Sequence, residues 1–483
     1  MSLAFPRADL YWLSWFMLVP LMYYTYQLTL HRALMCGMTF GMGFFAALLY
    51  WITIFGKFPW IALSIMEALF IAGFVVTAKL IGSKLSSWGR LVLLPVLWVI
   101  FEWIRSLGML GFSWGDIGYS QYKVLPVVQL ASFTGIWGIS FLLALSNAAL
   151  ANWAIERRNR RPLGSAHIQI SLVLLIVMAV FFFGSAAVRE QIAPEGRVIR
   201  AVIIQGNIGQ TSREADWLIR SWDTYRNMTL SERKKDVDLV VWPEAVVPGC
   251  LGRDRYTQQR LSDLAGDVGA HLFVGGFDYD NYGNNYNTAF LIGPKSGILG
   301  KYAKVHLVPF GEFVPARGYI PFLRYYMVRS TTTSSGSGYN LLDTGSYKIG
   351  TAICFESAFA YTLRRMTASG ADLLCVITDD EWFGRTSAAE QHMIKSVFRA
   401  VENRRYILHG AATGISCIID PQGRIIHKTG IFRSGVVRGK VHTLSGKTFY
   451  TRYGDWLAGI SVIIVCIQAL IAFTRTKSEK DKV

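Results

Sequence analysis

The stretch YKIGTAICFES, residues 347–357, predicts a buried β-strand that ends at a cysteine, with a carboxylate two residues further on. Ile349, Thr351 and Ile353 supply the alternation and β-branching that are typical of a strand. A nucleophile at the end of a strand is held rigidly and faces a cleft. Taken alone, Cys354 is more simply interpreted as a small buried hydrophobic residue. The rest of the chain favours the nucleophile.

The composition indicates a membrane part and a soluble part. Of the 483 residues, 52% are hydrophobic and 17% are charged, which is too apolar for an ordinary soluble protein and too charged for a wholly membrane-embedded one. The net charge of +17 favours basic cytoplasmic loops and anionic lipid over a nucleic-acid partner. The six scattered cysteines form no CxxC motif and accompany no histidine cluster, so no metal, cofactor or disulfide framework is predicted.

Seven largely apolar runs are interpreted as membrane helices, since a helix needs about 20 residues to cross the hydrocarbon. They are residues 10–30, 33–56, 58–78, the shorter 91–104, 125–155, 168–188 and 456–474. Six of them form a predicted N-terminal membrane domain, residues 1–190. The seventh, within residues 453–474, follows the soluble part and precedes a basic tail at 475–483. The first run is longer than the apolar core of a signal peptide, and no small-residue cleavage site follows it.

The basic loops predict the orientation of these helices. The block RRNRR at residues 157–161 is expected to stay in the cytoplasm. Counting spans from it places the other basic connections and the C-terminal tail on the same side. The loop at residues 111–122 and the whole region between the sixth and seventh helices then lie outside. That loop is rich in glycine and aromatic residues, and either lines a lipid-facing cleft or forms an aromatic belt.

Three charged residues, Glu67, Glu102 and Arg105, lie in or next to these apolar runs. Glu67 lies inside an apolar run, where a carboxylate is costly and has either a function or an interhelical partner. Glu102 and Arg105 are spaced three residues apart and are expected to pair at the end of their helix.

From about residue 197 to 442, short strands alternate with helix-capable stretches. Strands are predicted at 198–205, 236–242, 271–277, 286–292, 297–305, 348–353, 372–378, 406–412 and 416–420, with a hairpin joining the fourth and fifth. Helices are predicted at 217–234, 258–268, 358–368 and 388–405. This alternation predicts a layered α/β domain. The apolar segment 319–328 is either an arm at the membrane interface or over the site, or a buried part of the core.

Three segments of this domain place a polar group in an apolar setting. They are VVWPEAVVPG at 240–249, with Glu244 just after a strand; KYAKVHLVPFGEFVP at 301–315, with Lys304 and Glu312; and ICFE at 353–356, with Cys354 and Glu356. Acyl transfer needs a nucleophile, a base and a group that stabilises the oxyanion. A thiolate is the best nucleophile available here.

In this order the three segments resemble the nitrilase, or carbon–nitrogen hydrolase, superfamily, whose catalytic set is Glu, Lys and Cys. With membrane helices on both flanks, the whole chain resembles the apolipoprotein N-acyltransferases of the bacterial inner membrane. The similar segments are QGNIGQ (205–210), WPE, LVPFGEFVP, CFE, EWFG (381–384) and ATGIS (412–416). The resemblance implies a membrane α-helical bundle with a periplasmic α-β-β-α sandwich, residues 197–445, inserted before the final transmembrane helix.

The resemblance also implies roles for single residues. Cys354 is the nucleophile, Glu244 is the base if burial raises the pKa of its carboxylate, and Lys304 is the positive charge beside the oxyanion. Backbone N–H groups near Phe355 assist Lys304. Glu312 and Glu356 either orient Lys304 and the nucleophile loop or form structural ion pairs. The implied substrate-binding residues are Trp217, Trp382 and Phe383.

The implied reaction has two halves and two membrane-bound partners. Cys354 takes an acyl chain from a phospholipid, expected to be phosphatidylethanolamine, and forms a thioester. The α-amine of an S-diacylglyceryl cysteine at the N-terminus of an apolipoprotein then accepts the chain as an amide. The alternatives are a membrane-anchored amidase that transfers acyl groups to water, and a membrane sensor or transporter with an inactive nitrilase-like domain. The intact catalytic set argues against the latter, and the number of helices argues against the former.

The sequence departs from the family pattern at a few positions. Residues 378–381 read Thr, Asp, Asp, Glu where the family has Asn-Asp and a small residue. Phe355 stands where Tyr is common, and His409 stands where Arg is common. The family carries eight membrane helices, so this chain is expected to begin at the second. These departures concern the surroundings of the site and leave the catalytic set intact.

Overall fold

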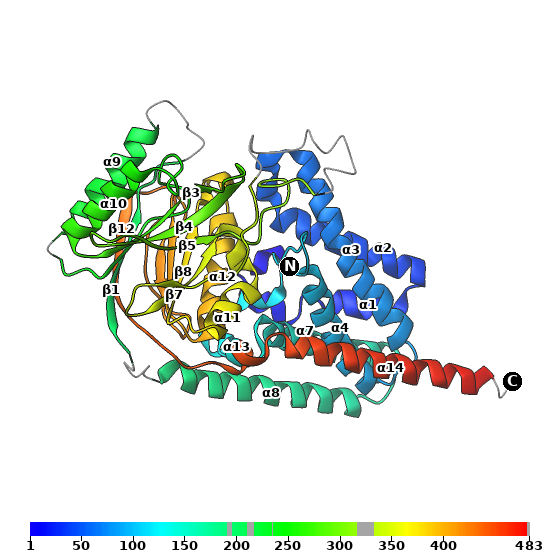
Figure 1. The fold of residues 1–483 in the computed structure, drawn as a ribbon. Coiled ribbons are helices and arrows are strands. Elements are labelled where there is room, and N and C mark those ends of the chain that lie inside the picture. Colours follow the sequence, from blue (N-terminus) through cyan, green and yellow to red (C-terminus); the bar gives the residue numbers. More distant parts are fainter. Residues whose placement is uncertain (191–195, 210–216, 234, 316–332, 481–483) are drawn as a thin grey trace. The chain divides into compact units, whose positions relative to one another are not determined.

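The computed structural model describes residues 1–190, 196–209, 217–233, 235–315 and 333–480. The chain divides into two compact units, one formed by Met1–Glu190 with Tyr453–Val483 and the other by Gln191–Arg452. The first unit is helical, and the second contains two sheets with helices (Figure 1). The predicted arm at 319–328 lies outside the described residues, so its role stays a prediction.

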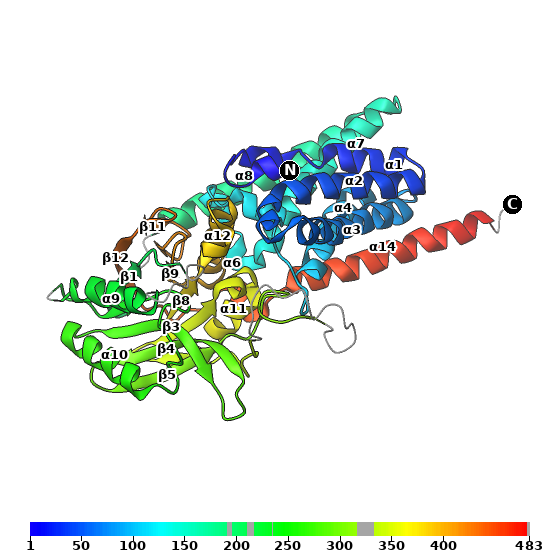
Figure 2. The same cartoon turned by 90° about the horizontal axis from the view of Figure 1, so that it is seen from above.

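The helical unit is built from long helices that pack side by side (Figure 2). They are α1 Val19–Gln27, α2 Leu30–Leu48, α3 Lys57–Gly82, α4 Ser87–Arg105, α7 Ile136–Arg158, α8 Gly164–Arg189 and α14 Trp456–Lys480. Helix α3 packs against α2 and α4, and α4 packs against α7 and α14. Helix α8 contacts α7 and the short α5, Leu125–Val128.

Small residues let α2 and α3 approach closely. A Cβ atom added to Gly41 would lie 2.7 Å from the Cα atom of Ala68, and one added to Gly37 would lie 2.8 Å from the Cα atom of Ala72. These distances are shorter than van der Waals contact, so a larger residue at either glycine would push the helices apart. Close packing of this kind holds helices together where lipid removes the hydrophobic driving force between them.

Four helices, α3, α4, α7 and α8, are long and apolar enough to cross a membrane, and α14 contains a shorter apolar stretch, Trp456–Ala472. The first predicted run differs from the structure. Residues 10–30 contain a 3₁₀ turn, Tyr11–Trp15, followed by the nine-residue α1. Pro20 lies in the first turn of α1, where a missing N–H costs no hydrogen bond. One continuous helix is therefore not formed there, and the count of six N-terminal membrane helices stays a prediction.

A buried ion-pair cluster connects α3, α4 and the loop after α4. Arg105 Nη1 lies 2.8 Å from Glu67 Oε2, and Arg105 also pairs with Asp116. Glu102 accepts a hydrogen bond from Trp98 Nε1 at 2.8 Å and another from a backbone N–H of the loop. The prediction that Arg105 pairs with Glu102 is therefore wrong, because Arg105 pairs with Glu67 and Asp116 instead. The interhelical partner of Glu67 is Arg105, which explains how a carboxylate is retained inside an apolar run.

Two six-stranded sheets form the second unit, with strand orders β12-β1-β2-β3-β4-β5 and β11-β10-β9-β8-β7-β6. The first contains β1 Val198–Gln205, β2 Leu239–Val241, β3 His271–Tyr279, β4 Asn285–Gly293, β5 Gly297–Ala303 and β12 Gly435–His442. The second contains β6 Leu342–Asp343, β7 Lys348–Ile353, β8 Leu373–Thr378, β9 Ile407–Ala411, β10 Cys417–Ile419 and β11 Ile425–Lys428. Strands β1, β2 and β3 run parallel, as do β7, β8 and β9.

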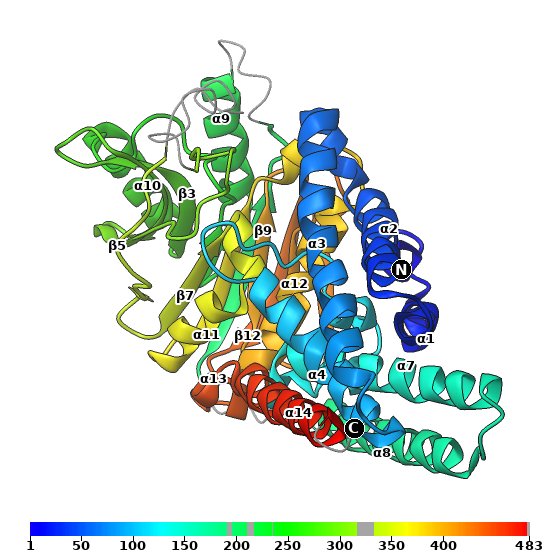
Figure 3. The same cartoon turned by 90° about the vertical axis from the view of Figure 1, so that its right-hand side faces the viewer.

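The sheets lie face to face and helices cover their outer faces (Figures 1 and 3). Strand β1 contacts β9, and β4 contacts β7. Helices α9 (Trp217–Leu230) and α10 (Arg255–Val268) pack on the first sheet. Helices α11 (Ala360–Ala368) and α12 (Ala388–Asn403) pack on the second. The predicted fold class, a membrane helical bundle plus an α-β-β-α sandwich, is confirmed.

The sandwich also contains strands that the sequence pattern did not predict. Strands β1 and β7 have the predicted bounds, and the predicted hairpin is formed by β4 and β5. Strands β6, β11 and β12 were missed. All three are edge strands. Basic residues in β11, and glycine and basic residues in β12, interrupt the alternation of apolar and polar residues that predicts a strand.

Candidate active site

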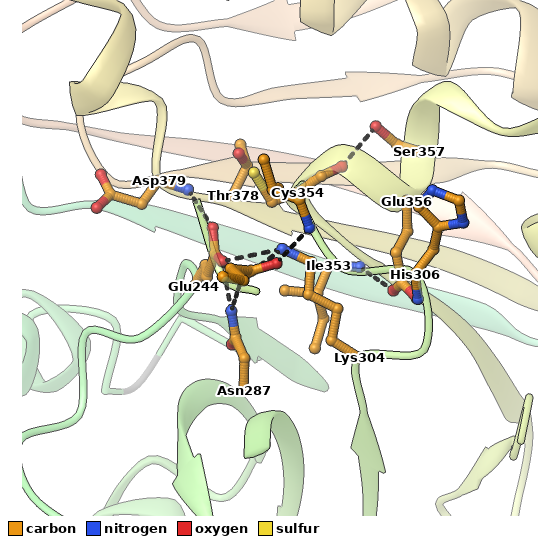
Figure 4. A network of polar contacts seen from close by, with 12 residues as sticks. Glu244, Asn287, Lys304, His306, Ile353, Cys354, Glu356, Ser357, Thr378 and Asp379 are labelled. Carbon is orange, nitrogen blue, oxygen red and sulfur yellow. Dashed lines mark hydrogen bonds and ion pairs between the residues drawn. The ribbon is translucent and has the colours of Figure 1, made fainter. Parts of the chain in front are cut away.

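Glu244, Lys304 and Cys354 lie together although each follows a different strand (Figure 4). Glu244 comes after β2 and Lys304 after β5 of the first sheet, whereas Cys354 follows β7 of the second. The side chains of Glu244 and Lys304 are 3% and 1% exposed, and Cys354 is partly buried. In layered α/β proteins, functional groups gather at strand ends. The structure thus brings the three predicted catalytic residues to one place.

The Glu244 carboxylate is held at both oxygens. Asn287 Nδ2 donates to Oε1 at 2.6 Å, and the backbone N–H of Asp379 donates to Oε2 at 2.7 Å. Lys304 Nζ lies 3.8 Å from Oε1. Asp379 acts through its main chain, and its own carboxylate points away from Cys354 (Figure 4). The contact of this residue with Glu244 therefore does not depend on its side chain.

Lys304 is a buried ammonium group between two carboxylates. Nζ donates to Glu312 Oε1 at 2.9 Å, and the other Glu312 oxygen accepts from the Val308 N–H at 2.8 Å. Burial would lower the pKa of Lys304, but the charges of Glu312, Cys354 and Glu244 raise it above the ordinary value. Lys304 therefore stays charged, and its charge is fixed beside Glu244 and Cys354.

Cys354 adopts a strained backbone conformation at the end of β7. Its φ is +53°, in the left-handed region that costs a residue with a side chain about 1–3 kcal/mol. The Thr378 hydroxyl, which donates to Asp380 Oδ1 at 2.8 Å, lies beside this residue (Figure 4). Burial and the charge of Glu244 raise the pKa of Cys354 well above the ordinary value, while Lys304 lowers it. The resting group is therefore a thiol, and a neighbouring base is needed to take its proton during attack.

Glu356 joins the nucleophile turn to the segment that carries Lys304. Its two oxygens accept from the Tyr302 hydroxyl at 2.9 and 3.0 Å, and from the backbone N–H groups of Val305 at 2.8 Å, His306 at 2.9 Å and Ile353 at 2.9 Å. Burial raises the pKa of Glu356 to about 6, although these backbone donors favour the charged form. The predicted orienting role suits this geometry, because the donors come from both sheets.

The predicted aromatic residues lie at different places. Phe355 is buried, with its ring 5.0 Å from that of Phe359. Trp382 and Phe383 lie partly buried in the 3₁₀ turn Asp380–Phe383 that follows β8. Trp217 is the first residue of α9 and is partly buried. The segment after β8 also supplies the Asp379 N–H to Glu244. Substrate contact by Trp217, Trp382 and Phe383 stays a prediction.

Sequence reasoning missed three residues that surround the catalytic candidates. Asn287 lies in β4, Tyr302 in β5 and Thr378 at the end of β8, and all three are fully buried. A polar group at a fully buried strand position needs a hydrogen-bond partner. That rule would have singled out these residues, but it would not have named their partners.

Replacing Asn287 tests how much the position of the Glu244 carboxylate matters. In Asn287→Ala the strong donor to Oε1 is lost, so we expect acyl-enzyme formation to slow by about tenfold to a hundredfold, the equivalent of one hydrogen bond to a charged group. Asn285→Ala, two residues earlier on the same strand, is the matched control and should keep the wild-type rate. A single-turnover measurement with labelled substrate compares them, and equal rates for the two variants would contradict the role of Asn287.

The raised pKa of Glu356 predicts a pH dependence of stability. A carboxyl group titrates near 4.3 when unfolded and near 6 in the fold. Its stabilising contribution is therefore full below about pH 4.3 and is lost as the pH rises through about 6. The thermal midpoint of the wild type, relative to Glu356→Gln, should be higher at pH 5 than at pH 7.5. Differential scanning calorimetry checks this, and an offset that does not change with pH would contradict it.

The two-sheet sandwich with its buried Glu, Lys and Cys places the second unit in the carbon–nitrogen hydrolase class. In agreement, the Carbon-nitrogen hydrolase family model matches residues 200–443. The Apolipoprotein N-acyltransferase N-terminal domain model matches residues 1–149. The chain belongs to the apolipoprotein N-acyltransferase family.

Curated relatives support this membership over nearly the whole chain. The apolipoprotein N-acyltransferase of Geobacter metallireducens is 35% identical and covers 98% of this chain and 94% of the relative. That of Methylococcus capsulatus is 31% identical and covers 88% of this chain and 85% of the relative. Among solved structures, a nitrilase-superfamily member of Saccharomyces cerevisiae matches with a TM-score of 0.40 at 22% identity, over 51% of this chain and 90% of that one.

Proposed function

We propose that this chain moves a fatty acyl chain from a membrane phospholipid, through a thioester on Cys354, to the N-terminal amine of a diacylglyceryl apolipoprotein. Its family membership makes it an acyltransferase of lipoprotein biosynthesis. The observation that supports the mechanism is that partly buried Cys354 lies together with buried Glu244 and Lys304. At this site, a thiol has both a carboxylate and a fixed positive charge beside it.

In the first half-reaction, the Cys354 sulfur bonds to the ester carbonyl carbon of the phospholipid and its proton passes to Glu244. The carbonyl oxygen becomes an oxyanion, stabilised by Lys304 and by backbone N–H groups near Phe355. Collapse breaks the ester C–O bond. Glu244 returns the proton to the leaving oxygen, so the products are the thioester and a lysophospholipid.

In the second half-reaction, the neutral α-amine of the S-diacylglyceryl cysteine attacks the thioester carbonyl carbon. Glu244 takes a proton from the attacking nitrogen, the C–S bond breaks, and the proton passes to the sulfur of Cys354. The products are an N-acyl amide and the free thiol. A site with little water would protect the thioester from hydrolysis between the two halves.

The membrane arrangement and the donor belong to the same proposal. The domains are a membrane part at 1–190, a catalytic part at 197–445 on the periplasmic face of the inner membrane, a transmembrane helix within 453–474 and a cytoplasmic tail at 475–483. The apolar helices α3, α4, α7 and α8 and the basic block RRNRR support this topology. Phosphatidylethanolamine is the proposed donor, as the family resemblance implies.

The test uses the full-length protein with phosphatidylethanolamine carrying a radiolabelled acyl chain. We expect a label on the protein that hydroxylamine removes, as it removes thioesters. Adding a diacylglyceryl-cysteine peptide should discharge the label onto the peptide amine. A protein that never becomes labelled would contradict the proposal. A label that disappears equally fast with and without peptide would instead favour an amidase that transfers acyl groups to water.

A further inference from the structure

Helix α12 places a buried histidine, which the proposed acyl-transfer steps do not use, against the nucleophile turn. His392 is fully buried, and its Nε2 lies 3.0 Å from the main-chain carbonyl oxygen of Cys354. Its Nδ1 lies 2.9 Å from Asp380 Oδ1. The ring thus bridges the turn after β8 and the turn after β7, the two segments that meet at the site.

The Ser357 hydroxyl completes the contacts around this turn (Figure 4). It donates to the Cys354 carbonyl at 2.9 Å and lies 2.8 Å from His392 Nε2. Since its one hydrogen goes to the carbonyl, the serine presents its oxygen lone pairs to the histidine. Two oxygen acceptors, the carbonyl and the serine hydroxyl, therefore face Nε2.

Oxygen atoms lie within hydrogen-bonding distance of both nitrogens of the His392 ring. The Cys354 carbonyl oxygen can only accept a hydrogen bond, so the ring is placed to donate to it from Nε2. Burial disfavours a charged Asp380, yet the charge and hydrogen bond of His392 hold the pKa of that carboxyl below its ordinary value. The two side chains thus form a buried hydrogen-bonded pair, 2.9 Å apart at Nδ1 and Oδ1.

A second buried histidine, His409, lies beside His392. The His409 ring lies 5.8 Å from that of His392. Burial and the charge of His392 lower the pKa of His409 to about 3, so His409 is neutral. Its Nδ1 is hydrogen-bonded to the Ser396 hydroxyl at 2.8 Å. Of these two rings, His392 is the one that contacts the Cys354 carbonyl.

We infer that His392, held by Asp380, is a positioning residue for the nucleophile, because it fixes the left-handed turn at Cys354 and polarises the Cys354–Phe355 peptide. A strained backbone conformation persists only where its surroundings over-determine it, and the bond to the carbonyl does this. A donor on the carbonyl of a peptide also strengthens the N–H group of the same peptide as a donor. That N–H belongs to Phe355, beside the expected oxyanion. The inference rests on the proposed role of Cys354 as the nucleophile.

Two substitutions of His392 separate the two contacts of the ring. In His392→Gln the side-chain nitrogen takes the place of Nε2, so a donor to the Cys354 carbonyl is kept. In His392→Asn the nitrogen takes the place of Nδ1, so only the contact with Asp380 is kept. Ser396→Ala removes a hydrogen bond in the same buried cluster without touching the nucleophile turn, and serves as the control.

The readouts are the rate constant of acyl-enzyme formation at saturating labelled phosphatidylethanolamine and the KM for that lipid. We expect the Asn variant to be slower by about a hundredfold, the cost of misplacing a reacting group by about 1 Å, with KM within about twofold of wild type. The Gln variant should recover about tenfold of that loss. The Ser396→Ala protein should keep the wild-type rate.

Equal rates for the Gln and Asn variants, or a raised KM at an unchanged rate constant, would overturn the inference. If the wild type itself forms no Cys354 adduct, the proposed function fails and not this inference alone. Should a His392 variant lose its thermal unfolding transition, Asp380→Asn gives the decisive measurement, because it keeps the shape of the pair and removes the negative charge. It should lower the rate constant at unchanged KM, and a wild-type rate would overturn the inference.

Discussion

Cys354→Ala is expected to remove both the acyl adduct and the transfer of acyl chains to a lipoprotein peptide. The sulfur is the atom that bonds to the acyl group, and no other described cysteine lies beside Glu244 and Lys304. Loss of a nucleophile in a catalytic set lowers turnover by about 10⁵- to 10⁶-fold. The measurement is incorporation of a labelled acyl chain into the protein at saturating phospholipid, resolved by electrophoresis with and without hydroxylamine.

The controls for this variant distinguish loss of chemistry from loss of structure. Alanine keeps the Cβ atom, so the strain of the left-handed turn at position 354 is retained and the thermal midpoint should change little. Cys250→Ala alters another partly buried cysteine of the same unit, and should label like the wild type. A hydroxylamine-sensitive label that persists in Cys354→Ala would exclude Cys354 as the acyl carrier.

Lys304→Met is expected to reduce acyl-enzyme formation by about 10³-fold, the cost of losing a preorganised charge beside the oxyanion. The substitution has a second effect, because Glu244 and Glu312 both lie within 4 Å of the lost ammonium group. Without it the two carboxylates repel each other, which disturbs the position of Glu244 beside Cys354. Single-turnover rates measure the combined loss.

The same substitution should destabilise the fold by about 3–5 kcal/mol, since it leaves buried carboxylates without their counter-charge. Lys301→Met is the matched control, three residues earlier on β5. Its side chain is 60% exposed and pairs with Asp278 at 2.6 Å. Asp278 is 9% exposed, but solvent screens the lysine end of this pair, so that variant should keep its rate and lose less stability than Lys304→Met. Equal losses of rate and stability in the two variants would contradict the role proposed for the Lys304 charge.

Most of the sandwich was predictable because burial imposes local patterns on the chain. Strands β1 and β7 are buried along nearly their whole length, and their apolar, β-branched runs predicted the observed bounds. Strand β11 is largely exposed, and β12 is mostly half-buried and interrupted by glycine and basic residues, so no such pattern marks them. They are strands because they pair with β10 and β1, and β12 pairs with a strand more than two hundred residues away in the chain. Local sequence carries little information about such pairing.

The candidate site was predictable in part for a similar reason. Glu244, Lys304 and Cys354 are polar residues that follow apolar strands, so each stands out from its own neighbours. Asn287 and His392 were not predicted as site residues. A buried polar residue in a strand or helix indicates that a hydrogen-bond partner exists, but the sequence does not show which residue that partner is. The partners of Arg105 illustrate the same limit. The sequence spacing predicted a pair with Glu102, three positions away, whereas Arg105 pairs with Glu67 and Asp116 in the structure.

The stretch YKIGTAICFES shows where the two kinds of information divide. That a strand ends there in a cysteine, and that the cysteine follows a glutamate and a lysine in the family order, can be known from the sequence alone, since both are properties of neighbouring residues and their order. Only the tertiary structure shows that Cys354 is left-handed, protonated at rest and backed by His392. Strain, pKa and hydrogen bonding depend on which groups lie within a few ångströms in space, and the packing of two sheets and α12 decides that.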